Sequence, residues 1–269
     1  MQRSKNIPTV NLDKLSYVAI PLKILSNTGH VLGICTGFIY KRSGQYYLIT
    51  NWHCFTGKHP ETGKPINDDF VLPAKIQIPF HKTKKPFITW ERHNFKLIDK
   101  ATNPKWLIHP IHKQKIDVVA LKLKIPTDII LHPINGEGFD TYKPMISDNV
   151  FILGFPYNIK GGGNFPIWKK ASISTEPDID YNSKPQILVD TASRKGMSGA
   201  PVIFRRTGIH GLVGGKPVGS SVIGEIQNFL GVYSGRYTGD TDFDAQLGII
   251  WKAKVIDEII DANILDTIN

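Results

Sequence analysis

The hydrophobic and polar positions of this chain mostly follow the two-residue period of half-buried β-strands. Runs of β-branched and aromatic residues alternate with turns rich in Gly, Pro, Asn and Asp, a pattern typical of antiparallel sheets. The pattern predicts strands over residues 15–25, 31–40, 46–50, 74–79, 87–93, 115–124, 149–155, 168–174, 186–189, 201–204, 221–225 and 229–233. Strands at such short spacing indicate an all-β barrel or sandwich.

Helical periodicity is found only at the end of the chain. Residues 252–264 place Val255, Ile256, Ile259 and Ile260 on one face of a helix, with charged residues largely opposite. We therefore expect an amphipathic terminal helix that packs against the β-strands.

Composition and charge narrow the class of protein. A hydrophobic content of 41% in 269 residues is ordinary for a folded chain and suits one large all-β unit or two packed halves. The net charge is +10, but the basic residues stand in small scattered groups, which favours a solvated surface over a nucleic-acid site. There are two cysteines, no hydrophobic leader and no run of about 18 apolar residues, so we expect a soluble cytoplasmic protein.

Three residues at strand ends carry the candidate chemistry. Ser198 lies between Gly196 and Gly199 just before a strand, His53 follows a hairpin, and Asp117 precedes a continuous apolar run. Each alone is also compatible with a structural role: a strand-entry turn, a packing histidine and a strand-start cap. Together they supply a nucleophile, a base and an orienting carboxylate, the minimum set for acyl transfer through a serine.

The sequence resembles the chymotrypsin-like (trypsin-fold) serine peptidases. Three segments carry the resemblance, and their order His, Asp, Ser is that of this family: residues 48–54 (LITNWHC), 116–121 (IDVVAL) and 196–201 (GMSGAP). The resemblance implies two packed six-stranded antiparallel β-barrels followed by a C-terminal α-helix. It implies a lead-in over 1–14, an N-terminal barrel over 15–130, a linker over 131–148, a C-terminal barrel over 149–251 and the helix region over 252–269.

The resemblance also assigns roles to individual residues. The catalytic residues would be His53, Asp117 and Ser198, and the backbone N–H groups of Gly196 and Ser198 would form an oxyanion hole. The residues expected to contact substrate are Ala192, Ser193, Lys195, Ser234, Gly235, Arg236 and Gly248. Cys35 and Cys54 occupy places that face each other in the family, so they would form a disulfide or remain as adjacent thiols; a zinc site that adds His59 is a further alternative by residue type.

Two departures from the family pattern matter for function. Met197 stands where secreted members carry the Asp that pairs with a cleaved N-terminus, so we expect a site that is formed constitutively or through a regulatory partner protein. Ala192, at the expected base of the specificity pocket, has no charge, so cleavage after Lys or Arg is not expected.

The resulting prediction is a serine endopeptidase that needs no cofactor or metal. Its substrate is expected to be a protein or peptide, and no membrane is expected among its partners. Two other classes stay open: a non-catalytic trypsin-fold module that binds other molecules, and a basic β-barrel that binds nucleic acid.

Overall fold

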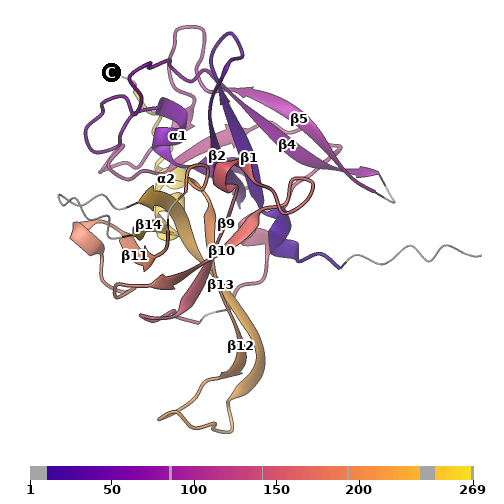
Figure 1. The fold of residues 1–269 in the computed structure, drawn as a ribbon, viewed down its shortest axis with the longest axis vertical. Coiled ribbons are helices and arrows are strands. Elements are labelled where there is room, and N and C mark those ends of the chain that lie inside the picture. Colours follow the sequence, from indigo (N-terminus) through magenta and orange to yellow (C-terminus); the bar gives the residue numbers. More distant parts are fainter. Residues whose placement is uncertain (1–10, 85–86, 141, 193, 237–245, 268–269) are drawn as a thin grey trace, which may run out of the picture.

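The computed structural model describes residues 11–84, 87–140, 142–192, 194–236 and 246–267 (Figure 1). They form two antiparallel β units and a C-terminal helix, so the predicted all-β class is confirmed. In this described part of the chain, no helix is both long and apolar enough to cross a membrane. Most of the predicted lead-in, residues 1–10, lies outside the described residues.

The first unit is a sheet of eight strands in the order β5-β4-β1-β2-β3-β7-β6, with β8 paired to β4. Its strands are β1 (Ala19–Leu25), β2 (Val31–Arg42), β3 (Gln45–Thr50), β4 (Lys75–Lys84), β5 (Phe87–Lys96), β6 (Trp106–Leu107), β7 (Val119–Leu123) and β8 (Ile129–Ile130). Six strands were predicted here. The difference lies in β6 and β8, which are two residues long and leave no periodic pattern in the sequence.

The second unit is a closed barrel of six strands, as predicted, in the order β10-β11-β14-β13-β12-β9. Its strands are β9 (Asn149–Gly154), β10 (Ile167–Ile173), β11 (Gln186–Asp190), β12 (Pro201–His210), β13 (Val222–Arg236) and β14 (Leu247–Lys252). Short 3-10 turns connect elements in both halves: η1 (Lys14–Tyr17), η2 (Ile134–Gly136), η3 (Pro156–Asn158) and η4 (Tyr181–Ser183).

Strands β12 and β13 are longer than the sequence pattern indicates. Only their inner parts pair with β9 and β14, and the outer parts form a hairpin that projects from the barrel in Figure 1. Gly208 and Gly224 face each other inside this ladder. The two strands expected over 221–225 and 229–233 are therefore one.

The terminal helix connects the second β unit to the first. Helix α2 (Lys254–Ala262) buries the four residues of its predicted apolar face, and it ends where Asn263 adopts a left-handed conformation at φ 51°. Burial of each such Val or Ile side chain contributes about 1.5–3 kcal/mol. On its polar side Asp257 accepts hydrogen bonds from Tyr40 and from Arg42 of β2. The helix therefore follows the second unit but packs on the first.

Candidate active site

His53 is held at the start of a short helix that follows strand β3. Helix α1 (Trp52–Thr56) is preceded by Asn51, whose extended backbone ends the strand, and it stops at Gly57, which has φ 67°. The Asn51 side-chain amide donates a 2.7 Å hydrogen bond to the backbone carbonyl of Asp117. This bond ties the end of β3 to the residue that precedes β7 by two positions.

Asp117 is buried, with 1% of its surface exposed, and both oxygens of its side chain lie within hydrogen-bond distance of partners. Its Oδ2 lies 2.7 Å from Nδ1 of His53, and its Oδ1 accepts the backbone N–H of His53 at 2.9 Å. The hydroxyl of Ser234 on β13 donates to the same Oδ2 at 2.5 Å. A buried carboxylate requires such partners, and they fix the plane of the His53 ring.

The electrostatics of this pair favour a basic imidazole. Burial of the His53 ring disfavours its protonated form, but the charge of Asp117 and its hydrogen bond outweigh burial, so the pKa of His53 is raised. Because Asp117 accepts at Nδ1, that nitrogen carries the proton in the neutral ring. The other nitrogen, Nε2, is then the acceptor.

Ser198 lies in a loop whose conformation requires glycine at two positions. Gly196 has φ 95°, and a Cβ there would lie 2.3 Å from the carbonyl oxygen of Phe155. Gly199 has φ 82°, and a Cβ there would lie 2.2 Å from the carbonyl oxygen of Thr36. These close approaches explain the two glycines around the serine.

Both halves of the molecule hold this loop. Thr36 of β2 donates its N–H to the Ser198 carbonyl at 2.8 Å and its hydroxyl to the Gly196 carbonyl at 2.7 Å. From the barrel, the carbonyl of Tyr233 accepts the N–H of Gly199 at 2.8 Å. Thr36 was not among the predicted site residues, because a threonine within an apolar strand carries no signal of this contact.

Two peptide planes in the loop have a defined orientation. The Lys195 carbonyl accepts the N–H of Tyr157 at 2.8 Å, and the Met197 carbonyl accepts the N–H of Ala200 at 3.0 Å. In a trans peptide the N–H points opposite to the carbonyl. The N–H of Gly196 therefore points away from Tyr157, and the N–H of Ser198 points away from Ala200.

His53, Asp117 and Ser198 line one cleft of about 660 Å³, together with Ser234 and Gly235. Among the described residues, no hydrogen bond joins the Ser198 hydroxyl to His53. Such bonds are often long without substrate. A Cβ on Gly235 would lie 3.8 Å from Oγ of Ser198, so the glycine keeps space open beside the hydroxyl.

The described residues among those predicted to contact substrate divide into two groups. Lys195, Ser234 and Gly235 line the cleft, whereas Ala192 and Gly248 do not. Ser193 and the side chain of Arg236 lie outside the described residues. A Cβ on Gly248 would lie 2.5 Å from the ring of Tyr233, which is buried in the barrel core. Tyr233 therefore occupies the space beside Gly248, a contact that no local pattern in the sequence reveals.

The cleft has a basic rim, and only some of its residues were predicted from the sequence. Four of its lining residues are Lys or Arg, namely Lys115, Lys184, Arg194 and Lys195, and two are acidic, namely Glu61 and Asp117. Both carboxylates have partners, Glu61 in Lys184 and Asp117 in His53. Lys115 and Lys184 were missed because they lie in turns far from the Ser198 loop in the sequence, and no local pattern places them beside it.

Cys35 and Cys54 form a disulfide with a Cα–Cα distance of 6.3 Å. This bond links β2 to helix α1 next to His53. Within the described ranges, no group of three or more His, Cys, Asp or Glu side chains is arranged to hold a metal ion. The sulfur atoms that the zinc alternative requires are engaged in the disulfide.

The fold and this site define a class of proteins: two β units, with a His–Asp pair and a glycine-flanked serine in one cleft. The family model of the trypsin-like peptidase domain matches residues 35–212. The chain therefore belongs to that family, and it has the domain and fold of trypsin-like serine proteases.

Solved structures are similar to this chain at the level of fold. A thermostable serine protease, AL20, from an extremophilic microorganism has a TM-score of 0.50 and 12% identity, covering 93% of this chain and 98% of that one. The active form of the Rv3671c protease of M. tuberculosis has a TM-score of 0.47 and 16% identity, covering 97% and 91%. Human heparin binding protein has a TM-score of 0.47 and 11% identity, covering 92% and 90%. No curated protein sequence matches this chain.

Proposed function

We propose that this protein is a serine endopeptidase in which Ser198 is the nucleophile, His53 the general base and Asp117 the residue that orients His53. The observation that carries the proposal is the buried Asp117 carboxylate bonded to Nδ1 of His53 in the same cleft as Ser198. This arrangement leaves Nε2 of His53 free of the proton and able to accept one from a serine.

The reaction has two steps. His53 takes the hydroxyl proton as Oγ of Ser198 attacks the peptide carbonyl, and it then gives that proton to the leaving amine as the C–N bond breaks. Water attacks the resulting acyl-enzyme, His53 takes the water proton, and the proton returns to Oγ as the ester bond breaks. The Gly196 and Ser198 N–H groups, oriented by the two fixed peptide planes, stabilise the oxyanion.

The active loop shape that we propose does not depend on a cleaved N-terminus. Met197 is 1% exposed and packs in the barrel core, so an apolar contact replaces the ion pair of secreted relatives. Thr36 and Tyr157 hold the loop through hydrogen bonds within the chain. A regulatory partner could act on this loop, but the proposed active conformation does not require one.

The proposed substrates are proteins or peptides that are not cleaved after Lys or Arg. The basic rim formed by Lys115, Lys184, Arg194 and Lys195 repels a cationic side chain. Neither Ala192 nor the core side chain of Tyr233 supplies an anion deeper in the barrel. Acidic or neutral side chains fit this cleft better.

A fluorophosphonate probe tests the proposal, since it labels only an activated serine. We expect stoichiometric labelling of the wild-type protein and none of Ser198→Ala, with Ser220→Ala as a matched control that labels fully. An unlabelled wild-type protein would contradict the enzyme and favour a non-catalytic binding module. Salt-sensitive retention on nucleic acid that Ser198→Ala leaves unchanged would favour the nucleic-acid-binding alternative.

A further inference from the structure

The chain that follows helix α2 returns to the first sheet. We call residues 264–267 the tail. The N–H of Ile108 donates to the carbonyl of Ile264 at 3.0 Å, and the N–H of Asp266 donates to the carbonyl of Trp106 at 3.1 Å. Strand β6 stands at the end of the strand order of this sheet, so the tail adds to its outer edge.

The tail carries a buried carboxylate that two indole rings contact. Asp266 is 7% exposed, and its Oδ2 accepts the Nε1–H of Trp52 at 2.7 Å and that of Trp106 at 3.0 Å. Its Oδ1 accepts the backbone N–H of Thr267 at 2.8 Å. A carboxylate leaves water at low cost only when such donors replace the water, and an indole has a single donor. The bonds therefore fix the two rings relative to the tail.

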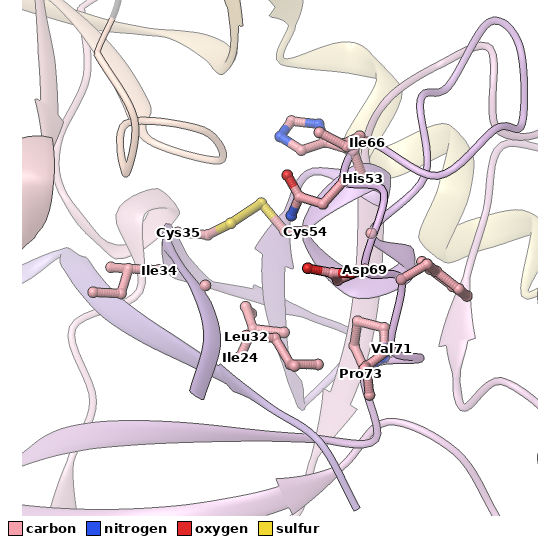
Figure 2. A pocket seen from close by; sticks show the side chains of 14 residues that line it. Ile24, Leu32, Ile34, Cys35, His53, Cys54, Ile66, Asp69, Val71 and Pro73 are labelled. Carbon is pink, nitrogen blue, oxygen red and sulfur yellow. A yellow bond between two sulfur atoms is a disulfide. The ribbon is translucent and has the colours of Figure 1, made fainter. Parts of the chain in front are cut away.

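Three different segments hold the residues on either side of His53. Asn51 is hydrogen-bonded to the segment that precedes β7, and Cys54 is joined to β2 by the disulfide that Figure 2 shows next to His53. Trp52 is hydrogen-bonded to Asp266 of the tail. The first two anchors lie within the first β unit, whereas the third comes from chain that follows the second β unit.

The tail has a defined position relative to both β units. It begins directly after helix α2 and the residue that caps it. The apolar face of α2 lies in a core cluster with Phe38 and Ile49 of the first sheet and with Ile203 and Val232 of the barrel. The bond from the tail to Trp52 therefore links helix α1 to the contact between the two units.

The distance between His53 and Ser198 depends on that contact, because the two residues come from different β units. His53 belongs to helix α1, and Ser198 precedes β12 of the barrel. Proton transfer between Nε2 and Oγ requires about 2.6–3.2 Å, and a misplacement of about 1 Å can cost about 10²-fold in rate. A bond that holds α1 from the tail therefore bears directly on the rate.

We propose that Asp266 is a positioning residue for the reaction, which acts through Trp52 on the place of helix α1. Nε2 of His53 is thereby directed to Oγ of Ser198. This inference rests on the proposed peptidase function and gives the tail a part in it. Asp266 does not line the cleft, so it contacts neither substrate nor the reacting atoms. Asp117 sets the tautomer of His53, whereas Asp266 sets the place of the ring.

Trp52→Phe tests this role, because it deletes the Nε1 donor and keeps an aromatic ring. p-Nitrophenyl acetate and a fluorophosphonate serve as probes, since both report on Ser198 without knowledge of the peptide specificity. We expect kcat for the ester and the second-order rate constant of labelling to fall about tenfold or more. KM is expected to stay unchanged, and labelling that is run to completion is expected to remain stoichiometric.

Trp168→Phe is the matched control. The Nε1–H of Trp168 on β10 donates to the hydroxyl of Ser16 at 3.0 Å, so the same substitution again removes an indole hydrogen bond that joins two distant segments. Both variants are expected to unfold at a lower temperature than the wild-type protein. Trp168→Phe is expected to keep the wild-type kcat and labelling rate, measured well below both unfolding midpoints.

Asp266→Asn removes the charge from the same contact and is combined with Trp52→Phe in a double-mutant cycle. Both changes weaken one bond, so the double variant is expected to be no slower than the slower single variant. The acid limb of the pH profile separates this role from that of Asp117. Its midpoint is expected to stay at the wild-type value in all three variants, because Asp117 still raises the pKa of His53.

The outcomes separate the two proposals. A Trp52→Phe variant with the wild-type kcat and labelling rate overturns the positioning role and leaves the peptidase intact. A Trp168→Phe variant that loses as much does the same, because the loss would then follow from destabilisation alone. Losses that add in the double variant, or a pH midpoint that moves with the rate, also overturn the positioning role. A wild-type protein that neither releases p-nitrophenol nor takes the fluorophosphonate overturns the peptidase, and the positioning role with it.

Discussion

His53 lines two hollows, and the side chains around these hollows differ in charge and polarity. The cleft on the Ser198 side has a volume of about 660 Å³ and a rim of lysine and arginine side chains. The hollow beside the Cys35–Cys54 disulfide has a volume of about 180 Å³, and most of the side chains that line it are apolar. Charges act over about 8 Å at physiological ionic strength and weaken with salt. Burial of apolar surface acts only on contact and does not weaken in this way.

In the proposed peptidase, the two hollows would therefore act differently on a substrate. The basic rim would attract or repel charged groups at a distance, and the hollow beside the disulfide would act only on groups that touch it. The chemistry between them is common to both, so changes at the His53–Asp117 pair affect all substrates equally. Changes at either hollow alter preferences, which makes the two kinds of effect separable.

The largest expected effect comes from Asp117→Asn. An amide at this position no longer fixes the productive tautomer of His53, so turnover is expected to fall about 10⁴-fold. Steady-state kinetics on acidic, neutral and apolar peptides measure the change. We expect the same factor for each peptide; a loss confined to one class would mean that Asp117 contributes to specificity.

Gly196→Ala is expected to cost about 10²–10³-fold in turnover, the usual effect of losing one oxyanion donor. The added Cβ would lie 2.3 Å from the Phe155 carbonyl, so the peptide plane must move. Gly138→Ala is the control, because a Cβ at Gly138 has nothing within 4 Å. Equal activity of both variants would contradict the oxyanion role of this loop.

The acid limb of the pH profile tests the His53–Asp117 pair. Only neutral His53 accepts a proton, so the rate is expected to fall about tenfold per pH unit below the pKa of His53. Since that pKa is raised, the midpoint lies above the ordinary value of about 6.5. Removal of the charge in Asp117→Asn should move the midpoint of the residual activity down. An unchanged midpoint would exclude Asp117 as the cause.

The smallest expected effect concerns the basic rim. Lys115→Glu and Lys195→Glu should each lower kcat/KM for acidic peptides a few-fold, since an exposed ion pair contributes about 0.2–1 kcal/mol. The difference should vanish at 1 M salt, where charges are screened within about 3 Å. Lys100→Glu serves as control, because Lys100 does not line the cleft. A salt-independent effect would assign the preference to another feature.

The sequence located the three residues that carry the proposed chemistry, which the structure brings into one cleft, better than it located the walls around them. His53, Asp117 and Ser198 were identifiable because each follows or precedes a buried run and its chemistry needs a specific residue type. The first-unit strands of two residues and the long β12–β13 hairpin were not predictable from periodicity, since pairing across the sheet stabilises them.

The substrate-facing surfaces depended on contacts that no local pattern carries. Ala192 and Gly248 were expected in the specificity pocket, but the bulk of Tyr233 fills the space beside Gly248. The loop containing Ile66 has the glycines, prolines and aspartates of any surface turn. Its place beside the disulfide depends on where β1 and β2 put the opposite wall.

Thr36 gives the molecule a property that neither half has alone. The barrel holds Ser198 and closes on itself, yet two carbonyls of the loop around Ser198 accept hydrogen bonds from Thr36 on the other sheet. If the barrel were produced as a separate fragment, Ser198 would be present but its loop would lack these anchors. Recovery of fluorophosphonate labelling when the two fragments are mixed would then report reassembly of the whole protein.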